Sequence, residues 1–309
     1  MSVRIVMSCY NGEQFLLEQL VSIRDQLGPS VSLIARDDGS TDSTPQLLER
    51  FREENPDLKM EIVRGANLGA ANSFMAGLEL AGDFEHYAFA DQDDLWRKDK
   101  LARAVDKLAV SDRSNRPALY YSNVCYTDAD LQPLGRSDFC GPQTLERALF
   151  ENRAVGCTIV LNHAARSLVL ESWNADSQSF PGLMHDWWAS LVVTALGTTV
   201  FDDDAPIRYR QHAKNEIGGT SGALRSAMGK ARFFIRNGIT GYQPSRQAQG
   251  LLDFYADRLT PQQSRLLTRF LEGKSSLGSR VRLALGPDIR RENWFDRSVV
   301  RALVLLNRY

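Results

Sequence analysis

Four short apolar runs alternate with helical patterns in the first hundred residues, and this alternation is the feature that most constrains the fold. The runs are Val3–Cys9, Val31–Ala35, Met60–Val63 and His86–Ala90. Between them, apolar residues recur at the spacing of an amphipathic helix. Strands that alternate with helices form an open, mostly parallel sheet covered by helices. We therefore predict an α/β fold.

Each apolar run is followed by a polar loop. The loops are Tyr10-Asn11-Gly12, the stretch from Arg36 to Asp42, the stretch from Arg64 to Gly69, and Asp91-Gln92-Asp93-Asp94. In open parallel sheets the ligand binds in the crevice beyond the carboxyl ends of the strands, which is where all four loops are expected. The chain contains neither a Gly-x-Gly-x-x-Gly motif nor a Gly-x-x-x-x-Gly-Lys-Ser/Thr phosphate loop. Phosphate groups would therefore have to be held by other means.

The fourth loop carries three carboxylates in four positions, directly after a run that reads as a buried strand. Carboxylates packed this tightly repel one another unless they are solvated or hold a cation. Oxygen ligands suit Mg²⁺ or Mn²⁺, which keep coordination positions open for substrate phosphates. The alternative is the acidic N-terminus of a helix that begins near Lys98. The loop by itself leaves both interpretations open.

The charge distribution divides the chain. The 309 residues are 43% apolar, which is ordinary for a soluble globular protein, and the net charge of -1 gives no preference for nucleic acid. Residues 220–309 nevertheless contain 16 basic and 6 acidic side chains. We predict that this region is helical, with basic amphipathic stretches at Leu224–Ile235 and Arg297–Leu306. It would pack on the sheet, form a homodimer, or contact anionic lipid headgroups; solvated Arg-rich helix faces are the alternative.

Targeting signals are absent from the sequence as given. No apolar run approaches the roughly 18–20 residues of a membrane-spanning helix, and Met1 leads directly into a strand without a signal peptide. The four cysteines lack the spacing of a zinc site and fit reduced thiols. We expect a cytoplasmic protein that touches the inner face of the plasma membrane without crossing it.

The middle of the chain adds a second group of candidate residues. Pro117–Asp128 and Cys157–Leu161 are predicted strands, and Arg208–His212 contains another. His185-Asp186-Trp187-Trp188 opens a predicted helix. An aspartate at a helix start is often only a cap. Here the aromatic neighbours would raise its pKa, and their rings would suit the apolar faces of a sugar.

Taken together, these motifs resemble glycosyltransferases of family 2. The resemblance rests on Ser8-Cys9-Tyr10-Asn11-Gly12, Asp37-Asp38-Gly39-Ser40-Thr41-Asp42, Asn67-Leu68-Gly69, Asp91-Gln92-Asp93-Asp94 and His185-Asp186-Trp187-Trp188. It implies an inverting enzyme with the Rossmann-like GT-A fold in residues 1–219, followed by a helical appendage in residues 220–309. Tyr209-Arg210-Gln211-His212, with Asn215 and Gly218, is similar to bacterial rhamnosyltransferases of polysaccharide and O-antigen assembly. Ala213-Lys214 depart from that pattern, which usually has a Gly and a further Asn there.

The resemblance also implies roles for individual residues. Asp38 would accept a hydrogen bond from the pyrimidine imide, and Asp186 would be the catalytic base. The other nucleotide-binding residues would be Ser8, Tyr10, Asn11, Arg64, Asn67, Gly69 and Asp91. The metal ligands would be Asp93, Asp91 and His212. The candidates for contact with the diphosphate or the acceptor would be Arg210, Trp187 and Trp188.

The function that the resemblance implies is transfer of a sugar to a saccharide or lipid-linked acceptor, with Mg²⁺ or Mn²⁺ as cofactor. The expected donor is dTDP-L-rhamnose, and a UDP-hexose is the alternative. Two other classes remain as alternatives: a non-catalytic module that binds nucleotide sugars or cations, and a sugar nucleotidyltransferase. A sugar nucleotidyltransferase would need a Gly-rich, basic phosphate loop after the first strand, and Tyr10-Asn11-Gly12 is not such a loop.

Overall fold

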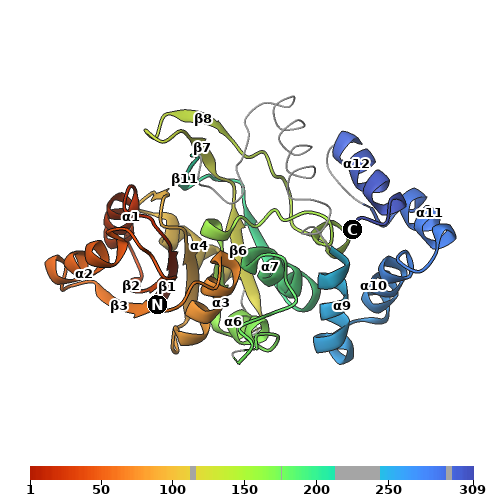
Figure 1. The fold of residues 1–309 in the computed structure, drawn as a ribbon, viewed down its shortest axis with the longest axis horizontal. Helices are drawn as coiled ribbons and strands as arrows, with labels where there is room; N and C mark the ends of the chain where they lie inside the picture. The colour runs from red at the N-terminus through yellow and green to blue at the C-terminus, as the bar shows by residue number, and fades with distance from the viewer. Residues whose placement is uncertain (112–115, 175, 213–243, 290–293) are drawn as a thin grey trace.

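The computed structural model of the chain describes residues 1–111, 116–174, 176–212, 244–289 and 294–309 (Figure 1). The basic stretch expected at Leu224–Ile235 lies outside these residues. Within them, the predicted alternation of strands and helices is confirmed. It builds a central sheet with helices on both faces and a group of further helices at the C-terminal end (Figure 1).

The central sheet has seven strands in the order β10-β6-β9-β4-β1-β2-β3. All neighbouring pairs are parallel except those made by β9, which runs antiparallel to β4 and β6. The prediction of a mostly parallel sheet is therefore confirmed. The strands are β1 (Ser2–Cys9), β2 (Ser30–Asp37), β3 (Lys59–Arg64), β4 (His86–Ala90), β6 (Ala118–Ser122), β9 (Val160–Asn162) and β10 (Thr198–Asp202).

The helices cover the two faces because successive strand residues point to opposite sides. Val6 belongs to one apolar cluster, with side chains of α3, α6 and α7, whereas its neighbour Ile5 belongs to the other, with side chains of α1, α2 and α4. These helices are α1 (Leu16–Arg24), α2 (Thr44–Glu54), α3 (Ala70–Leu80), α4 (Lys100–Ser111), α6 (His163–Leu170) and α7 (His185–Leu196). The two clusters place the sheet between two helical layers, so the strand ends form its accessible edge.

A second, four-stranded sheet has the order β5-β11-β7-β8. Its strands are β5 (Leu95–Trp96), β7 (Cys125–Thr127), β8 (Pro133–Arg136) and β11 (Ile207–Arg210). The single strand predicted at Pro117–Asp128 is therefore wrong: it is divided between β6 of the first sheet and β7 of the second. The division falls at Asn123, whose buried amide accepts from Ser137 Oγ at 2.7 Å and donates to Asp203 O at 3.2 Å.

The prediction of a strand at Cys157–Leu161 also changes in detail. A 3-10 turn, η1 (Gly156–Thr158), comes first, and the strand begins at Val160. The turn closes with Thr158 N donating to Val155 O at 2.8 Å. This turn places Gly156 and Cys157 beside the strand ends instead of within the sheet.

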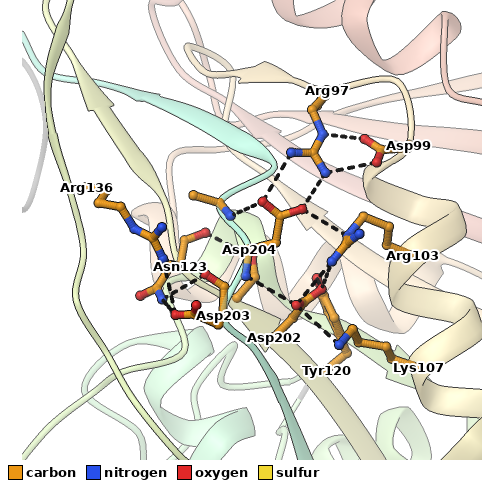
Figure 2. Close-up of polar contacts among 12 residues, drawn as sticks. Arg97, Asp99, Arg103, Lys107, Tyr120, Asn123, Arg136, Asp202, Asp203 and Asp204 are labelled. Carbon is orange, nitrogen blue, oxygen red and sulfur yellow. Dashed lines mark hydrogen bonds and ion pairs between the residues drawn. The ribbon is translucent and has the colours of Figure 1, made fainter.

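An acidic run, Asp202-Asp203-Asp204, joins the two sheets (Figure 2). Asp202 accepts from Tyr120 Oη of β6 at 3.1 Å and from Arg103 of α4 at 2.9 Å. Asp204 binds Arg97 at 2.6 Å, and this hydrogen bond is the main reason that its pKa is lowered to about 2. Each carboxylate thus has a cationic partner, which fixes the point where the chain leaves the first sheet and enters β11.

The C-terminal helices are α9 (Pro244–Tyr255), α10 (Pro261–Glu272), α11 (Leu277–Leu285) and α12 (Trp294–Leu305), with a short helix η2 (Ala256–Arg258) after α9. The helical prediction is confirmed for this described part. Another short helix, α5 (Leu145–Ala148), lies earlier in the chain, between β8 and η1. Helix α9 shares an apolar cluster with Trp188 of α7, and Tyr255 Oη donates to Leu168 O at 2.7 Å. Among the residues that the structure places, no helix combines the length and the apolarity that crossing a bilayer requires.

Candidate active site

The four polar loops meet at one edge of the central sheet, as the sequence predicts. Strand β1 pairs with β2 as far as Cys9 and Asp37, and with β4 as far as Met7 and Ala90, so the strands end side by side. Backbone bonds continue beyond the ladder, because Asp38 N donates to Cys9 O at 2.8 Å. The residues that follow these strands can therefore act on one ligand.

The loop after β1 is held to the loop after β2. Asn11 adopts a φ of 47°, in the left-handed region that asparagine tolerates better than most residues. Its backbone N–H donates to Ser40 Oγ at 3.0 Å, and its Oδ1 accepts from Thr41 N at 2.8 Å. Ser8 Oγ donates to Ser73 Oγ at 2.7 Å, while the Tyr10 side chain remains half exposed. Tyr10 is thus available to a nucleotide, whereas Asn11 shapes the loop.

Asp38 is almost completely buried beneath the loop after β3. Its Oδ1 accepts from Leu68 N at 2.9 Å, its Oδ2 accepts from Gly69 N at 3.0 Å, and the guanidinium of Arg36 pairs with it. This carboxylate therefore ties β2 to the loop that carries Asn67 and Gly69. Contact between Asp38 and a pyrimidine stays a prediction, because one of these bonds would have to be shared with the base.

The loop after β3 leaves room for a ligand. Gly69 has a φ of 76°, and a Cβ added there would meet no atom within 4 Å. Asn67 Oδ1 accepts from Gly69 N at 3.1 Å, which shapes the turn. Arg64 is exposed and reaches back to Glu49 at 3.4 Å. Of these three residues, Gly69 is the one whose backbone conformation requires its residue type, because a positive φ favours glycine.

The acidic loop after β4 brings Asp93 against the end of the second sheet. Asp93 Oδ2 lies 2.7 Å from Nε2 of His212, which follows β11. The two residues are 119 positions apart, so their pairing depends on how the second sheet packs. The predicted metal ligands Asp93 and His212 are thus neighbours in space.

The same loop contributes to a second group of ionisable side chains, of which Asp94 and Cys157 are buried and Asp91 is partly buried. Ligand atoms of Asp91, Asp94 and Cys157 fall within 4.8 Å of one another. Burial, with the charges of Asp91 and Asp93, raises the pKa of Asp94 well above its usual range. Lys100 lies 3.6 Å from the centre of the Trp96 ring, and burial lowers its pKa to about 7. Helix α4 begins at Lys100, so Asp94 does not cap it.

The donor set fits a divalent cation. Carboxylate oxygens with one imidazole nitrogen are ligands that Mn²⁺ accepts and Mg²⁺ tolerates. The Asp93 carboxylate and the His212 imidazole lie 2.7 Å apart, close enough to bind one ion together, and Asp91 precedes Asp93 by two positions on the same loop. The buried oxygen Asp94 Oδ2 also has no hydrogen-bond partner among the described residues. We therefore expect Asp93 and His212 to hold the ion, with Asp91 near it.

Arg210 has a different environment from the one expected of a diphosphate-binding residue. It is buried, its Nε donates to Asp93 O at 2.9 Å, and Nη2 pairs with Glu18 at 2.5 Å. Its guanidinium also lies 4.3 Å from the centre of the Phe15 ring. These contacts favour a positioning role, in which Arg210 fixes the backbone of the acidic loop.

Asp186 lies in the first turn of α7, behind the Met184 cap position. Its Oδ1 accepts from Trp187 N at 2.6 Å, and Asn152 and the Gly156 backbone also donate to the carboxylate. Burial outweighs these bonds and raises the pKa of Asp186 to about 6. A carboxylate with such a pKa can accept a proton near neutral pH, as a general base must.

His185 is buried beside Asp186 between two aromatic rings. Its ring stacks on Phe74 at 4.0 Å and meets Phe89 edge-on at 4.8 Å. Burial lowers its pKa to about 3, so the imidazole is neutral. Within the described part of the chain, neither ring nitrogen has a hydrogen-bond partner. His185 is therefore an uncharged, buried neighbour of the Asp186 carboxylate.

Residues Gly156 and Cys157 connect the two halves of the site. Gly156 donates its N–H to Asp186, and a Cβ added at Gly156 would lie 3.1 Å from His185 Nε2. The Cys157 thiol, on the next residue, lies against Asp94 and Asp91. A single turn thus sets the spacing between the candidate base and the acidic loop.

The two tryptophans after Asp186 lie in the protein core. Trp187 Nε1 donates to Ala148 O at 2.6 Å, and Trp188 Nε1 donates to Ser172 Oγ at 2.7 Å. Trp188 has no exposed surface, and Trp187 has little. Both hold α7 in place, so the expectation that their rings receive the acceptor finds no support in this arrangement.

Sequence reasoning missed several residues of the site. Gln92 is the neutral member of an acidic loop and is not among the predicted ligands, although its amide contacts Tyr10. Cys157 falls at the start of a predicted strand, and Gly156 directly precedes that strand. For Lys100, no local sequence signal marks the side chain as buried. Only Gln92 carried a sequence signal, namely its place between two predicted metal ligands.

Comparison with known proteins agrees with this geometry. The family description "Glycosyl transferase family 2" matches residues 4–136. The dTDP-rhamnosyl transferase RfbG of Shigella flexneri is 32% identical over 224 residues, which cover 69% of this chain and 73% of that protein.

Solved structures of low sequence identity share the fold. S. aureus TarS superposes with a TM-score of 0.58 at 16% identity, over 100% of this chain and 53% of that chain, and another TarS structure is a complex with UDP. The mannosyltransferase PcManGT from Pyrobaculum calidifontis, in complex with GDP-Man and Mn²⁺, gives 0.51 at 17% identity, over 99% and 85% of the two chains. These neighbours are glycosyltransferases of the GT-A fold.

Proposed function

The chain belongs to glycosyl transferase family 2, and from this premise we propose that it transfers L-rhamnose from dTDP-L-rhamnose to a saccharide or lipid-linked acceptor, with inversion at the anomeric carbon. Such a reaction serves the assembly of a bacterial cell-surface polysaccharide. The observation that carries the proposal is the turn at Gly156 and Cys157, which holds a carboxylate of raised pKa beside an acidic loop suited to a divalent cation.

In the proposed reaction Asp186 accepts the proton of the acceptor hydroxyl. The hydroxyl oxygen forms a bond to the anomeric carbon as the bond from that carbon to the diphosphate oxygen breaks, and dTDP leaves. Burial keeps Asp186 basic enough for this task, while neutral His185 adds no competing charge. Asp93 and His212 would hold the divalent ion. When bound, the ion would neutralise charge on the leaving diphosphate.

The choice of donor rests on the similarity to a dTDP-rhamnosyl transferase. A UDP-hexose remains the second candidate, because S. aureus TarS has been solved with UDP and shares the fold. Both donors carry a pyrimidine with an imide N–H, which is the group that Asp38 is predicted to recognise. The nucleotide site described above therefore suits either donor, and the sugar must be distinguished by experiment.

A thermal-shift panel tests the proposal directly. The ligands are dTDP-L-rhamnose, UDP-glucose, UDP-galactose and GDP-mannose, each with Mn²⁺ and with EDTA. We expect the largest rise in melting temperature from dTDP-L-rhamnose with Mn²⁺, since a ligand that binds only the folded state stabilises it. A larger rise with UDP-glucose or UDP-galactose would show that the donor is a UDP-hexose and not dTDP-L-rhamnose. The largest rise with GDP-mannose would refute recognition of a pyrimidine base.

We further propose that α11 brings the protein to an anionic membrane surface, where lipid-linked acceptors would be met. Leu277, Val281 and Leu285 recur every four residues along this helix and are all exposed. Arg282 is exposed beside them, and residues 274–309 contain 8 basic and 3 acidic side chains. An exposed apolar stripe with basic neighbours is the pattern of helices that lie in a membrane interface.

A further inference from the structure

The side chain of Gln92 forms a reciprocal pair with the backbone of Tyr10. Tyr10 N donates to Gln92 Oε1 at 2.9 Å, and Gln92 Nε2 donates to Tyr10 O at 3.0 Å. The carboxamide thereby satisfies both backbone groups of one residue, as a neighbouring strand would. Strand β4 pairs with β1 only as far as Met7 and Ala90. The Gln92 side chain thus extends the connection between the two strands into their loops.

Gly12 leaves the space that this pair occupies. A Cβ added at Gly12 would lie 2.1 Å from Gln92 Oε1 and 2.4 Å from Gln92 Cδ, which is closer than non-bonded atoms can approach. Any other residue at this position would displace the carboxamide. Glycine is required here because a larger side chain would not fit. A substitution at Gly12 therefore offers a second way to disrupt the hydrogen bonds between Gln92 and Tyr10 without changing Gln92 itself.

The two loops that Gln92 joins have different predicted ligands. The loop of Tyr10 and Asn11 is the predicted nucleotide loop, and Asn11 bonds Ser40 and Thr41 there. Gln92 itself stands between Asp91 and Asp93, and Asp93 pairs with His212. The pair of hydrogen bonds therefore spans the boundary between the nucleotide site and the metal site.

We propose that Gln92 is a positioning residue that couples nucleotide binding to divalent-metal binding. This inference rests on the proposed function. While the pair is intact, a ligand that orders one loop also orders the other, so the second ligand binds a site that is already arranged. The coupling is reciprocal: the factor by which metal raises nucleotide affinity equals the factor by which nucleotide raises metal affinity.

Calorimetry with dTDP, in Mn²⁺ and in EDTA, measures this factor together with the direct attraction between the ion and the diphosphate, so the contribution of Gln92 is the change in the factor when Gln92 is replaced. In the wild-type protein we expect Mn²⁺ to raise dTDP affinity by about 5–150-fold, the usual range of coupling between two sites. Gln92→Ala should reduce the factor by at least about fivefold, and titration of Mn²⁺ into the protein with and without dTDP should show the same reduction. Gly12→Ala should reproduce it, because the added methyl group displaces the carboxamide.

Gln26→Ala is the matched control. The Gln26 amide also bonds separate segments, but away from the site: it donates to Ser22 O of α1 at 3.0 Å and to Arg97 O at 2.9 Å, and it accepts from Leu101 N of α4 at 3.1 Å. It should lower the melting temperature without changing the coupling factor. The inference is overturned if Gln92→Ala and Gly12→Ala both keep the wild-type factor within twofold, or if the wild type binds dTDP equally well with and without Mn²⁺. Failure of the wild type to bind dTDP or UDP at all would overturn the proposed function as well.

Discussion

Asp186 combines the two properties that a general base needs, a raised pKa and a fixed direction. Asp186→Asn keeps the shape of the side chain and the bond from Trp187 N, but the amide cannot accept the proton. We expect transfer to a synthetic glycoside acceptor to fall by about 10²–10⁴-fold while dTDP affinity stays unchanged. Asp253→Asn, on the exposed side of α9, is the control. Transfer within about threefold of wild type would show that Asp186 is only structural.

The raised pKa of Asp186 also predicts a pH profile. The base acts in its deprotonated form, so the rate should be constant well above pH 6 and fall about tenfold per unit below it. The measurement is kcat/KM for transfer between pH 5 and pH 8, at a fixed Mn²⁺ concentration. A flat profile over this range would require a different proton acceptor.

Asp38 is already bonded within the protein, to Leu68, Gly69 and Arg36, and these contacts compete with its predicted recognition of a pyrimidine base. In the Asp38→Asn variant the amide can either accept a hydrogen bond from a base or donate one to it, so the protein should lose its preference for uracil over cytosine. We expect the ratio of UDP to CDP affinity to fall by about 5–150-fold, as for loss of one charge-assisted hydrogen bond. A purely structural role would lower both affinities equally, with a lower melting temperature. Calorimetry with both nucleotides distinguishes the two.

At the scale of elements, the sequence predicts the strands and helices that are determined by their own residues. The apolar run His86–Ala90 became β4 with the predicted limits, because a buried central strand is apolar throughout. The break at Asn123 was not predictable, since it depends on Asp203, 80 positions away. The pairing of Asp93 with His212 was suggested by family resemblance, and its geometry needs the second sheet. Burial of Lys100 and Trp188 likewise arises from packing and not from their neighbours in sequence.

Helix α11 gives an element-scale test of membrane contact. We expect the wild-type protein to float with phosphatidylcholine vesicles that contain phosphatidylglycerol, and not with phosphatidylcholine alone. Replacing both Leu277 and Leu285 with Glu should weaken vesicle binding by more than about tenfold, because two exposed leucines lose their apolar contact. Val110→Glu, an equally exposed apolar position on α4, is the matched control. Equal flotation of the Leu277/Leu285 variant would refute the role of α11.

For the whole molecule, the C-terminal helices share the core of the sheet. Gly250 of α9 packs so closely that an added Cβ would lie 2.4 Å from Pro181 Cβ and 3.1 Å from Trp188 Cη2. Gly250→Ala should therefore lower the free energy of unfolding by about 1–3 kcal/mol, despite the better helix propensity of alanine. Gly278→Ala on α11, where the added methyl group meets nothing within 4 Å, should be neutral or slightly stabilising.

The shared core also predicts how residues 1–219 and 220–309 unfold. Because α9 and α7 belong to one apolar cluster, urea should unfold the chain in a single transition followed alike by tryptophan fluorescence and circular dichroism. Gly250→Ala should shift that transition as a whole. Two transitions, with only one displaced by Gly250→Ala, would instead support two independent domains.

The turn at Gly156 and Cys157 offers a built-in chemical reporter. Burial and the carboxylates around it raise the pKa of the Cys157 thiol well above its usual range, so the group is protonated and shielded from alkylating reagents. Its alkylation rate, followed by peptide mass spectrometry, would measure how often the acidic loop separates from the turn. Donor and metal should slow that rate if they close the site. Occupancy could then be followed in a crude extract, before the natural acceptor is known.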